Sequence, residues 1–168
     1  MPSIVRVGGM DKRALSQALS GHHVQLNQAA KALFQDCRFT TLRYRKYIEI
    51  TSVSVADLGF QEGATYGQLT ARAKDSGLFE CPLELGPHLR LQFLDQPEGS
   101  DGFPATQGRA PPTSITVTSS PLDDSDETPK GFYLRCISGE LWLRGYWSWS
   151  GHMWSPEDVF VFCRGTEN

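Results

Sequence analysis

Three short runs near the C-terminal end of the sequence constrain the fold more than any other feature. They are "GFYLRCI", "LWLRGYW" and "DVFVFCR", at residues 131–137, 141–147 and 158–164. All three are rich in aromatic and branched apolar residues, and in the first two apolar and polar side chains alternate, as they do along a β-strand. The first two runs are separated only by "SGE", which is typical of a hairpin turn. We therefore expect a largely antiparallel β-sheet in this part of the chain.

The N-terminal part of the sequence follows a helical period instead. Leu15 and Leu19 are four residues apart and follow Asp11, whose side chain can cap the first amide groups of a helix. Asn27 precedes a second apolar pattern, "QAAKALF", and can cap it in the same way. Together these segments predict a helical hairpin, and we assign residues 1–43 to an N-terminal helical subdomain.

The remaining segment, residues 44–168, combines both periods. The sequence "YRKYIEITSVSV" predicts a strand over 44–55, and the alternation in "LRLQF" predicts another over 89–93. Between them lies "TYGQLTARAKDSGL", a predicted helix in which Thr65 and Gln68 stand at the spacing of a capping box. The expected fold class is α+β, with an N-terminal helical hairpin, one central helix and a C-terminal largely antiparallel β-sheet. The second segment is then an α+β subdomain that contains this sheet.

Charge and composition exclude several classes of protein. The formal net charge is −3, so the surface offers no broad basic field for non-specific nucleic-acid binding. No stretch approaches the roughly 18 apolar residues of a membrane helix, and no apolar run marks a signal peptide. We expect a soluble cytoplasmic protein without a membrane partner. The cysteines form no CxxC pair, and no glycine-rich nucleotide motif occurs, so neither a metal nor a cofactor is expected.

Longer stretches of the sequence carry a resemblance to other proteins. They are "VGGMDKRALSQAL…HHVQLNQAAKALF", "DLGFQEGATYGQLTARAKDSGLFECPLELGPHLRLQFLDQPEG" and "KGFYLRCISGELWLRGYW…WSPEDVFVF". On these residues the chain resembles a family of uncharacterised bacterial proteins of similar length. The resemblance covers nearly the whole chain, and "CPLELGPHLRLQ" is its most distinctive part. It implies a bacterial intracellular protein and no assigned chemistry.

The same distinctive stretch contains residue types that catalysis uses. As a small cytosolic hydrolase or transferase, the protein would use Cys81 or Glu84 together with His88. These residues lie within one short segment, whereas catalytic triads are usually assembled from distant parts of a chain. The alternative interpretation is that Cys81 packs in the core and the other two residues lie on a loop, which we favour. Asp95 and Gln96 follow the predicted strand and remain candidate polar groups.

Arginine and aromatic residues in the predicted strands indicate a binding surface. Guanidinium groups match carboxylates and phosphates, and aromatic rings supply faces for stacking. Our leading hypothesis is a binding or interaction module, rather than an enzyme, that recognises a polar or anionic ligand or a protein partner through one face of the sheet. The candidate ligand-binding residues are Arg90, Arg135, Trp142, Arg144, Tyr146 and Trp147.

Two further features stay open at the level of sequence. The basic stretch 38–47 follows the predicted helical hairpin, and together they form a second alternative, a DNA- or RNA-binding protein. The four tryptophans between residues 142 and 154 can form either an exposed platform for a sugar ring or partner, or a lid over the core.

Overall fold

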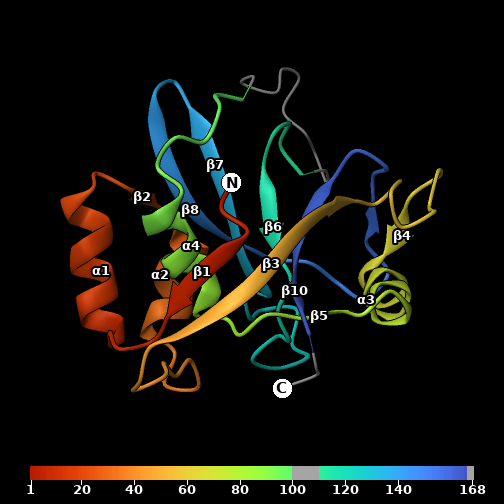
Figure 1. Cartoon of the computed structure of the whole chain (residues 1–168). Coiled ribbons are helices and arrows are strands. Elements are labelled where there is room, and N and C mark those ends of the chain that lie inside the picture. The colour runs from red at the N-terminus through yellow and green to blue at the C-terminus, as the bar shows by residue number, and fades with distance from the viewer. Residues whose placement is uncertain (100–109, 166–168) are drawn as a thin grey trace.

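The protein is described by a computed structural model that covers residues 1–99 and 110–165. Its centre is a large curled sheet, with helices on both sides (Figure 1). In spatial order the main strands are β1 (Ile4–Val7), β3 (Lys46–Ser54), β10 (Val159–Arg164), β6 (Ile115–Val117), β7 (Gly131–Ile137), β8 (Glu140–Tyr146) and β2 (Gln25–Leu26). The short strand β5 (Leu78–Phe79) also pairs with β10, and a separate two-stranded ribbon joins β4 (Ala64–Thr65) to β9 (Met153–Trp154).

Most neighbouring strands run antiparallel, as the sequence predicts. The exceptions among the described strands are the parallel pairs β10–β6 and β2–β8. The sheet is larger than expected because strands from the N-terminal segment join it. There β1 pairs with β3, and β2 pairs with β8, so the N-terminal segment contributes strands as well as the two expected helices. These two short strands form hydrogen bonds with backbone groups of β3 and β8 that a helical hairpin alone would leave unpaired.

Four helices occur in the described part of the chain: α1 (Lys12–Gly21), α2 (Gln28–Gln35), α3 (Tyr66–Asp75) and α4 (Leu85–Gln92). The predicted caps are confirmed for the first three. Asp11 and Asn27 each accept a hydrogen bond from the amide three residues ahead. Thr65 and Gln68 form the complete capping box at the start of α3. These caps are local contacts, which is why the sequence predicts them well.

The predicted strand at 89–93 is wrong, because most of that segment belongs to α4. Leu85 and Leu89, which are four residues apart in α4, are both fully buried. Arg90 of the same helix is also fully buried. Pro87 is tolerated because it lies in the first helical turn, where an amide proton has no helical partner. A short apolar run that is buried on several sides has no distinct period, so alternation alone cannot separate strand from helix.

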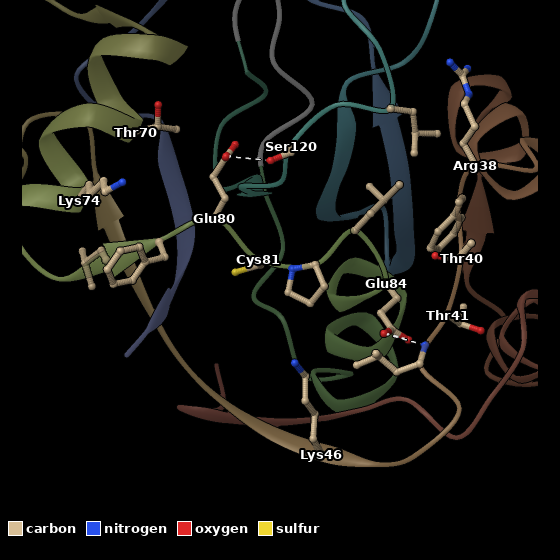
Figure 2. Close-up of a pocket in the computed structure, with 17 residues that line it drawn as sticks. Arg38, Thr40, Thr41, Lys46, Thr70, Lys74, Glu80, Cys81, Glu84 and Ser120 are labelled. Atoms are coloured by element: carbon tan, nitrogen blue, oxygen red, sulfur yellow. Dashed lines mark hydrogen bonds between the residues drawn. The ribbon is translucent and has the colours of Figure 1, made fainter. Parts of the chain in front are cut away.

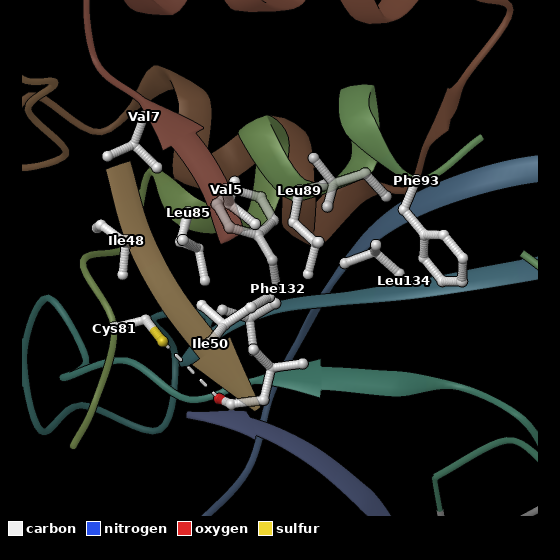
Figure 3. Close-up of a cluster of buried hydrophobic side chains, with 14 of the residues drawn as sticks. Val5, Val7, Ile48, Ile50, Cys81, Leu85, Leu89, Phe93, Phe132 and Leu134 are labelled. Carbon is white, nitrogen blue, oxygen red and sulfur yellow. Dashed lines mark hydrogen bonds between the residues drawn. The ribbon is translucent and has the colours of Figure 1, made fainter. Parts of the chain in front are cut away.

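Two hydrophobic clusters lie on opposite sides of the sheet, and β10 separates them. Val161 and Cys163 belong to the larger cluster, whereas Phe160 and Phe162 belong to the smaller one. The larger cluster packs between the sheet and α1, α2 and α4, and Figure 3 shows its centre around α4 and β3. The smaller cluster contains buried residues of α3. None of the helices among the described residues has the length and apolar character that a membrane span needs.

Candidate ligand-binding cavity

A cavity of about 690 Å³ opens where the chain passes from β5 to α4. The segment "CPLE", residues 81–84, lines it, and the facing walls come from the loop before β3, from β3 itself and from α3 (Figure 2). This size lies within the range of about 300–1,000 Å³ that is typical of small-molecule sites. The helix α4 holds the segment in place, because the buried Leu85 and Leu89 anchor it to the larger cluster.

Three cationic side chains reach this cavity from separate elements. Arg38 comes from the loop after α2, Lys46 from β3 and Lys74 from α3. Arg38 pairs with Asp36 at 2.5 Å and also with Asp123, and its hydrogen bonds lower the pKa of Asp36 to about 2. Lys46 is half-buried, and its amino group has no ion-pair or hydrogen-bond partner among residues 1–99 and 110–165. Its charge is therefore not neutralised by the described part of the chain.

The two carboxylates in the cavity wall are already engaged within the protein. Glu80 accepts hydrogen bonds from the hydroxyls of Tyr66, at 2.7 Å, and Ser120, at 3.0 Å. Burial, together with nearby Tyr146 and Glu80, raises the pKa of Tyr66 well above its usual value, so its hydroxyl stays a donor. Glu84 is only 2% exposed, and its Oε1 accepts a hydrogen bond from the Leu42 amide at 3.0 Å. Both carboxylates thus hold fixed positions in the cavity walls.

His88 lies one helical turn after Glu84, and it binds the backbone rather than a thiol. Its Nε2 accepts a hydrogen bond from the Gly8 amide at 3.0 Å, so this nitrogen carries no proton. The second oxygen of Glu84 lies 3.6 Å from the same nitrogen. Both side chains are buried. Their arrangement ties α4 to the end of β1 and to the loop before β3.

Cys81 is buried against the sheet and has sulfur and carbonyl neighbours. Its Sγ lies 2.7 Å from that of Cys163 and 3.9 Å from the Val161 carbonyl oxygen, as the dashed line in Figure 3 marks for the second contact. Burial, reinforced by Cys163, raises the pKa of the Cys81 thiol well above its usual value. The thiol is therefore held protonated, and its sulfur contacts Cys163 and Val161 rather than His88 or Glu84, the groups that a catalytic dyad would need.

Arg90 is placed by α4 and lies apart from the other predicted ligand-binding residues. It is fully buried, and its Nη1 donates to Gln96 Oε1 at 2.5 Å. Gln96 in turn donates to the carbonyls of Leu134 and Thr113, at 3.3 and 3.2 Å, so it links α4 to β7. Burial lowers the pKa of Arg90 to about 10. This arginine is part of the packing around α4 rather than of a solvent-facing sheet surface.

The structure does bring together the predicted residues on β7 and β8. Tyr133 pairs with Arg144 across the two strands, and Arg135 pairs with Trp142. The guanidinium of Arg144 lies 5.1 Å from the Trp142 ring centre and 5.9 Å from that of Tyr133, so it stacks between them. This set of side chains lies on the face opposite the larger cluster, because Leu134 and Leu143 belong to that cluster.

The remaining candidates divide between core and surface. Tyr146 packs edge-on against Trp154, with ring centres 5.7 Å apart, and both belong to the smaller cluster. Trp147 is 49% exposed, and its Nε1 donates to the Glu127 carbonyl at 3.1 Å. Asp95 follows α4 at the surface. The four tryptophans therefore form neither a single platform nor a single lid.

Sequence reasoning placed Arg38 and Lys46 in the basic stretch 38–47 but did not connect them with Lys74 or with a cavity. Lys46 and Lys74 stand in ordinary polar positions of a strand and a helix, and no motif joins them to "CPLE". Only the packing of α3 and β3 around this segment places them together. The described residues contain no group of three metal-ligating side chains.

Comparisons with protein-family models, with curated proteins and with solved structures each found no match to this chain. Its function has to be inferred from its own geometry.

Proposed function

We propose that the protein binds a small anionic ligand in the cavity lined by residues 81–84. The observation that carries this proposal is Lys46, a half-buried cation without a partner among residues 1–99 and 110–165, which lines a cavity whose two carboxylates are hydrogen-bonded inside the protein. An unpaired ammonium group in the wall favours a carboxylate or phosphate over a neutral ligand.

Hydroxyl groups add neutral hydrogen-bond partners around the same space. Thr40, Thr41, Thr70 and Ser120 line the cavity beside the cations. Such a mixture of point charges and hydroxyls suits a small ligand that carries both an anionic group and polar substituents. The proposed ligand is polar or anionic, as in the hypothesis from the sequence. Its proposed site is the cavity beside the "CPLE" segment, and the Arg144 face of the sheet is not part of that site.

Binding is supported over the enzyme alternative by the state of the candidate catalytic groups. The Cys81 thiol is buried and has a raised pKa, and Glu84 and His88 each accept a hydrogen bond from a backbone amide. With this burial and these hydrogen bonds, Cys81, Glu84 and His88 hold the cavity wall in position. The nucleic-acid alternative shares residues 38–42 and 46 with the cavity wall, so the probe distinguishes it: DNA would bind, and phosphate and citrate would not.

The proposal is tested by titrating the ¹⁵N-labelled protein with inorganic phosphate and, separately, with citrate. We expect saturable shifts of the amide signals of residues 80–84 for at least one of these anions. Lys46→Gln should weaken that binding about tenfold, because a hydrogen bond to a charged group is lost. The matched control is Lys31→Gln, which removes the same charge from an exposed position on α2 outside the cavity.

Several results would count against the proposal. If neither anion produces saturable shifts at residues 80–84, the cavity does not bind anions. If Lys46→Gln and Lys31→Gln weaken binding equally, the attraction is general to the surface and the assigned site is wrong. Mixed-sequence DNA at low salt provides the comparison for the nucleic-acid alternative.

A further inference from the structure

A second cavity, of about 400 Å³, shares no lining residue with the first. It lies beside the start of α3, the end of β8 and the short strand β9. Four aromatic side chains line it: Tyr66, Tyr146, Trp149 and Trp154. Aromatic walls of this kind suit a ligand with a flat or weakly polar face, in contrast to the cationic walls of the first cavity.

Trp149 is exposed, and its indole packs against the backbone of the same turn. Its side chain is 61% exposed, yet a tight turn holds its backbone, because the His152 amide donates to the Trp149 carbonyl at 3.0 Å. The indole lies directly against Gly151, where an added Cβ would come within 2.0 Å of the ring. Only glycine allows this close approach. The chain therefore presents a positioned aromatic face to solvent at the mouth of the cavity.

The deep wall holds two polar atoms that lack partners. Ser119 is 2% exposed and Trp154 is 5% exposed. Among residues 1–99 and 110–165, neither Ser119 Oγ nor Trp154 Nε1 has a hydrogen-bond partner. Both atoms are enclosed by neighbouring protein atoms, so the direct polar contacts for a ligand are the groups at the rim of the cavity.

Carboxylates outnumber cations among the described residues at the rim of the cavity. Asp124 and Asp126 line it and are exposed. The one cation in the lining, Lys130, donates to the carbonyls of Asp123 and Ser125, at 3.2 and 2.8 Å. An anionic ligand would therefore be repelled. A ligand cation would suit the carboxylates and the rings, but the Lys130 ammonium group lies in the same lining and would repel it.

We infer that this second cavity binds a saccharide, with a pyranose ring stacked on Trp149. The C–H face of a pyranose packs on an aromatic ring, and its hydroxyls both donate and accept. They can donate to Asp124 or Asp126 and accept from the Lys130 ammonium group at the same rim. A neutral ring that carries hydroxyls thus suits the aromatic wall and the charged rim together. This site is independent of the proposed anion site.

The test follows the four tryptophan indole N–H signals in ¹H–¹⁵N spectra during titration with simple glycosides. The probes are the methyl β-glycosides of glucose, galactose, mannose and N-acetylglucosamine. We expect at least one of them to shift the Trp149 and Trp154 signals in a saturable manner. Trp149→Ala should weaken this binding about tenfold through lost stacking. Trp147→Ala is the matched control, since it removes a comparably exposed indole near the same turn but outside the cavity.

Binding that shifts both signals, weakens in Trp149→Ala and is unchanged within about twofold in Trp147→Ala supports the saccharide site. Both substitutions are at exposed positions, and the unperturbed signals of the spectrum report that each variant is folded. The inference is overturned if none of the four glycosides moves the two signals, or if Trp149→Ala leaves the response intact. It is equally overturned if choline chloride moves them and no glycoside does, because the site then recognises a cation.

Discussion

Replacing Asn27 with alanine is expected to destabilise the protein far more than the loss of an ordinary helix cap. The Asn27 Oδ1 accepts from the amide of Ala30 at 3.0 Å, which caps α2, and also from the amide of Gly145 at 2.8 Å. Its Nδ2 donates to the Gly145 carbonyl at 2.9 Å. One side chain therefore joins a helix cap to β8, 118 residues further along the chain.

The expected loss of stability in Asn27→Ala is the sum of the losses of these contacts. Loss of the cap costs about 1 kcal/mol. Loss of the two bonds to the buried Gly145 costs about 1 kcal/mol each. The total is about 3 kcal/mol, which lowers the melting temperature by about 9 °C in a domain of this length. Asp11→Ala removes a cap alone, since among residues 1–99 and 110–165 only the Ala14 amide donates to Asp11, and it should lower the melting temperature by about 3 °C.

Urea unfolding and thermal melts of the two alanine variants measure the difference. Asn27→Asp is a third variant, which keeps both acceptor contacts but turns a carboxylate oxygen toward the Gly145 carbonyl oxygen in place of a donor, and it should therefore be less stable than the wild type. If Asn27→Ala costs no more than Asp11→Ala, then the contacts with Gly145 contribute nothing to stability. That result would refute the reasoning, because it would leave α2 docked on β8 by apolar packing alone.

Other predictions follow from burial and close packing. A thiol reagent at neutral pH should label Cys37 in the native protein and all four cysteines in denaturant, because Cys37 alone is exposed among them; labelling of native Cys81 would contradict its burial. Stability to urea should fall above about pH 9, because burial raises the pKa values of Cys81 and Tyr66 in the folded state, and the unfolded chain then loses protons first. The fall should be shallower in Tyr66→Phe, and an unchanged slope would argue against that contribution. Gly86→Ala should lower the melting temperature by several degrees, since its Cβ would lie 2.8 Å from that of Phe132, and an unaffected melt would mean that α4 shifts without cost.

Part of this fold could be predicted from the sequence because the deciding contacts are local. The caps at Asp11, Asn27 and Thr65 depend on amides only three residues away. The β7–β8 hairpin depends on a two-residue turn, in which Ser138 and Gly139 both have positive φ. In each case the residues that determine the structure are neighbours in the chain, so their pattern is visible without a three-dimensional arrangement.

The candidate sites could be predicted only in part, and the reason is again the range of the contacts. The strand register that places Arg144 between Trp142 and Tyr133 follows from the alternation in two neighbouring strands. The first cavity has no such local origin, because Lys46, Lys74 and the "CPLE" segment come from three separate elements. The second cavity likewise joins Ser119 to Trp149 through packing rather than through sequence proximity.

The segment 85–92 marks the boundary between what the sequence determined and what tertiary structure decided. Its residues are apolar enough for either a strand or a helix, and alternation favoured the strand. Burial of Leu85 and Leu89 against the sheet, with Gly86 close to Phe132, makes it α4. That helix carries Arg90 into the interior and sets the wall of the first cavity. The sequence by itself determined the caps, the hairpin and the antiparallel character of the sheet, because short-range hydrogen bonds specify them. Packing over long sequence distances decided the helix and the sites, because burial depends on every element that covers a residue.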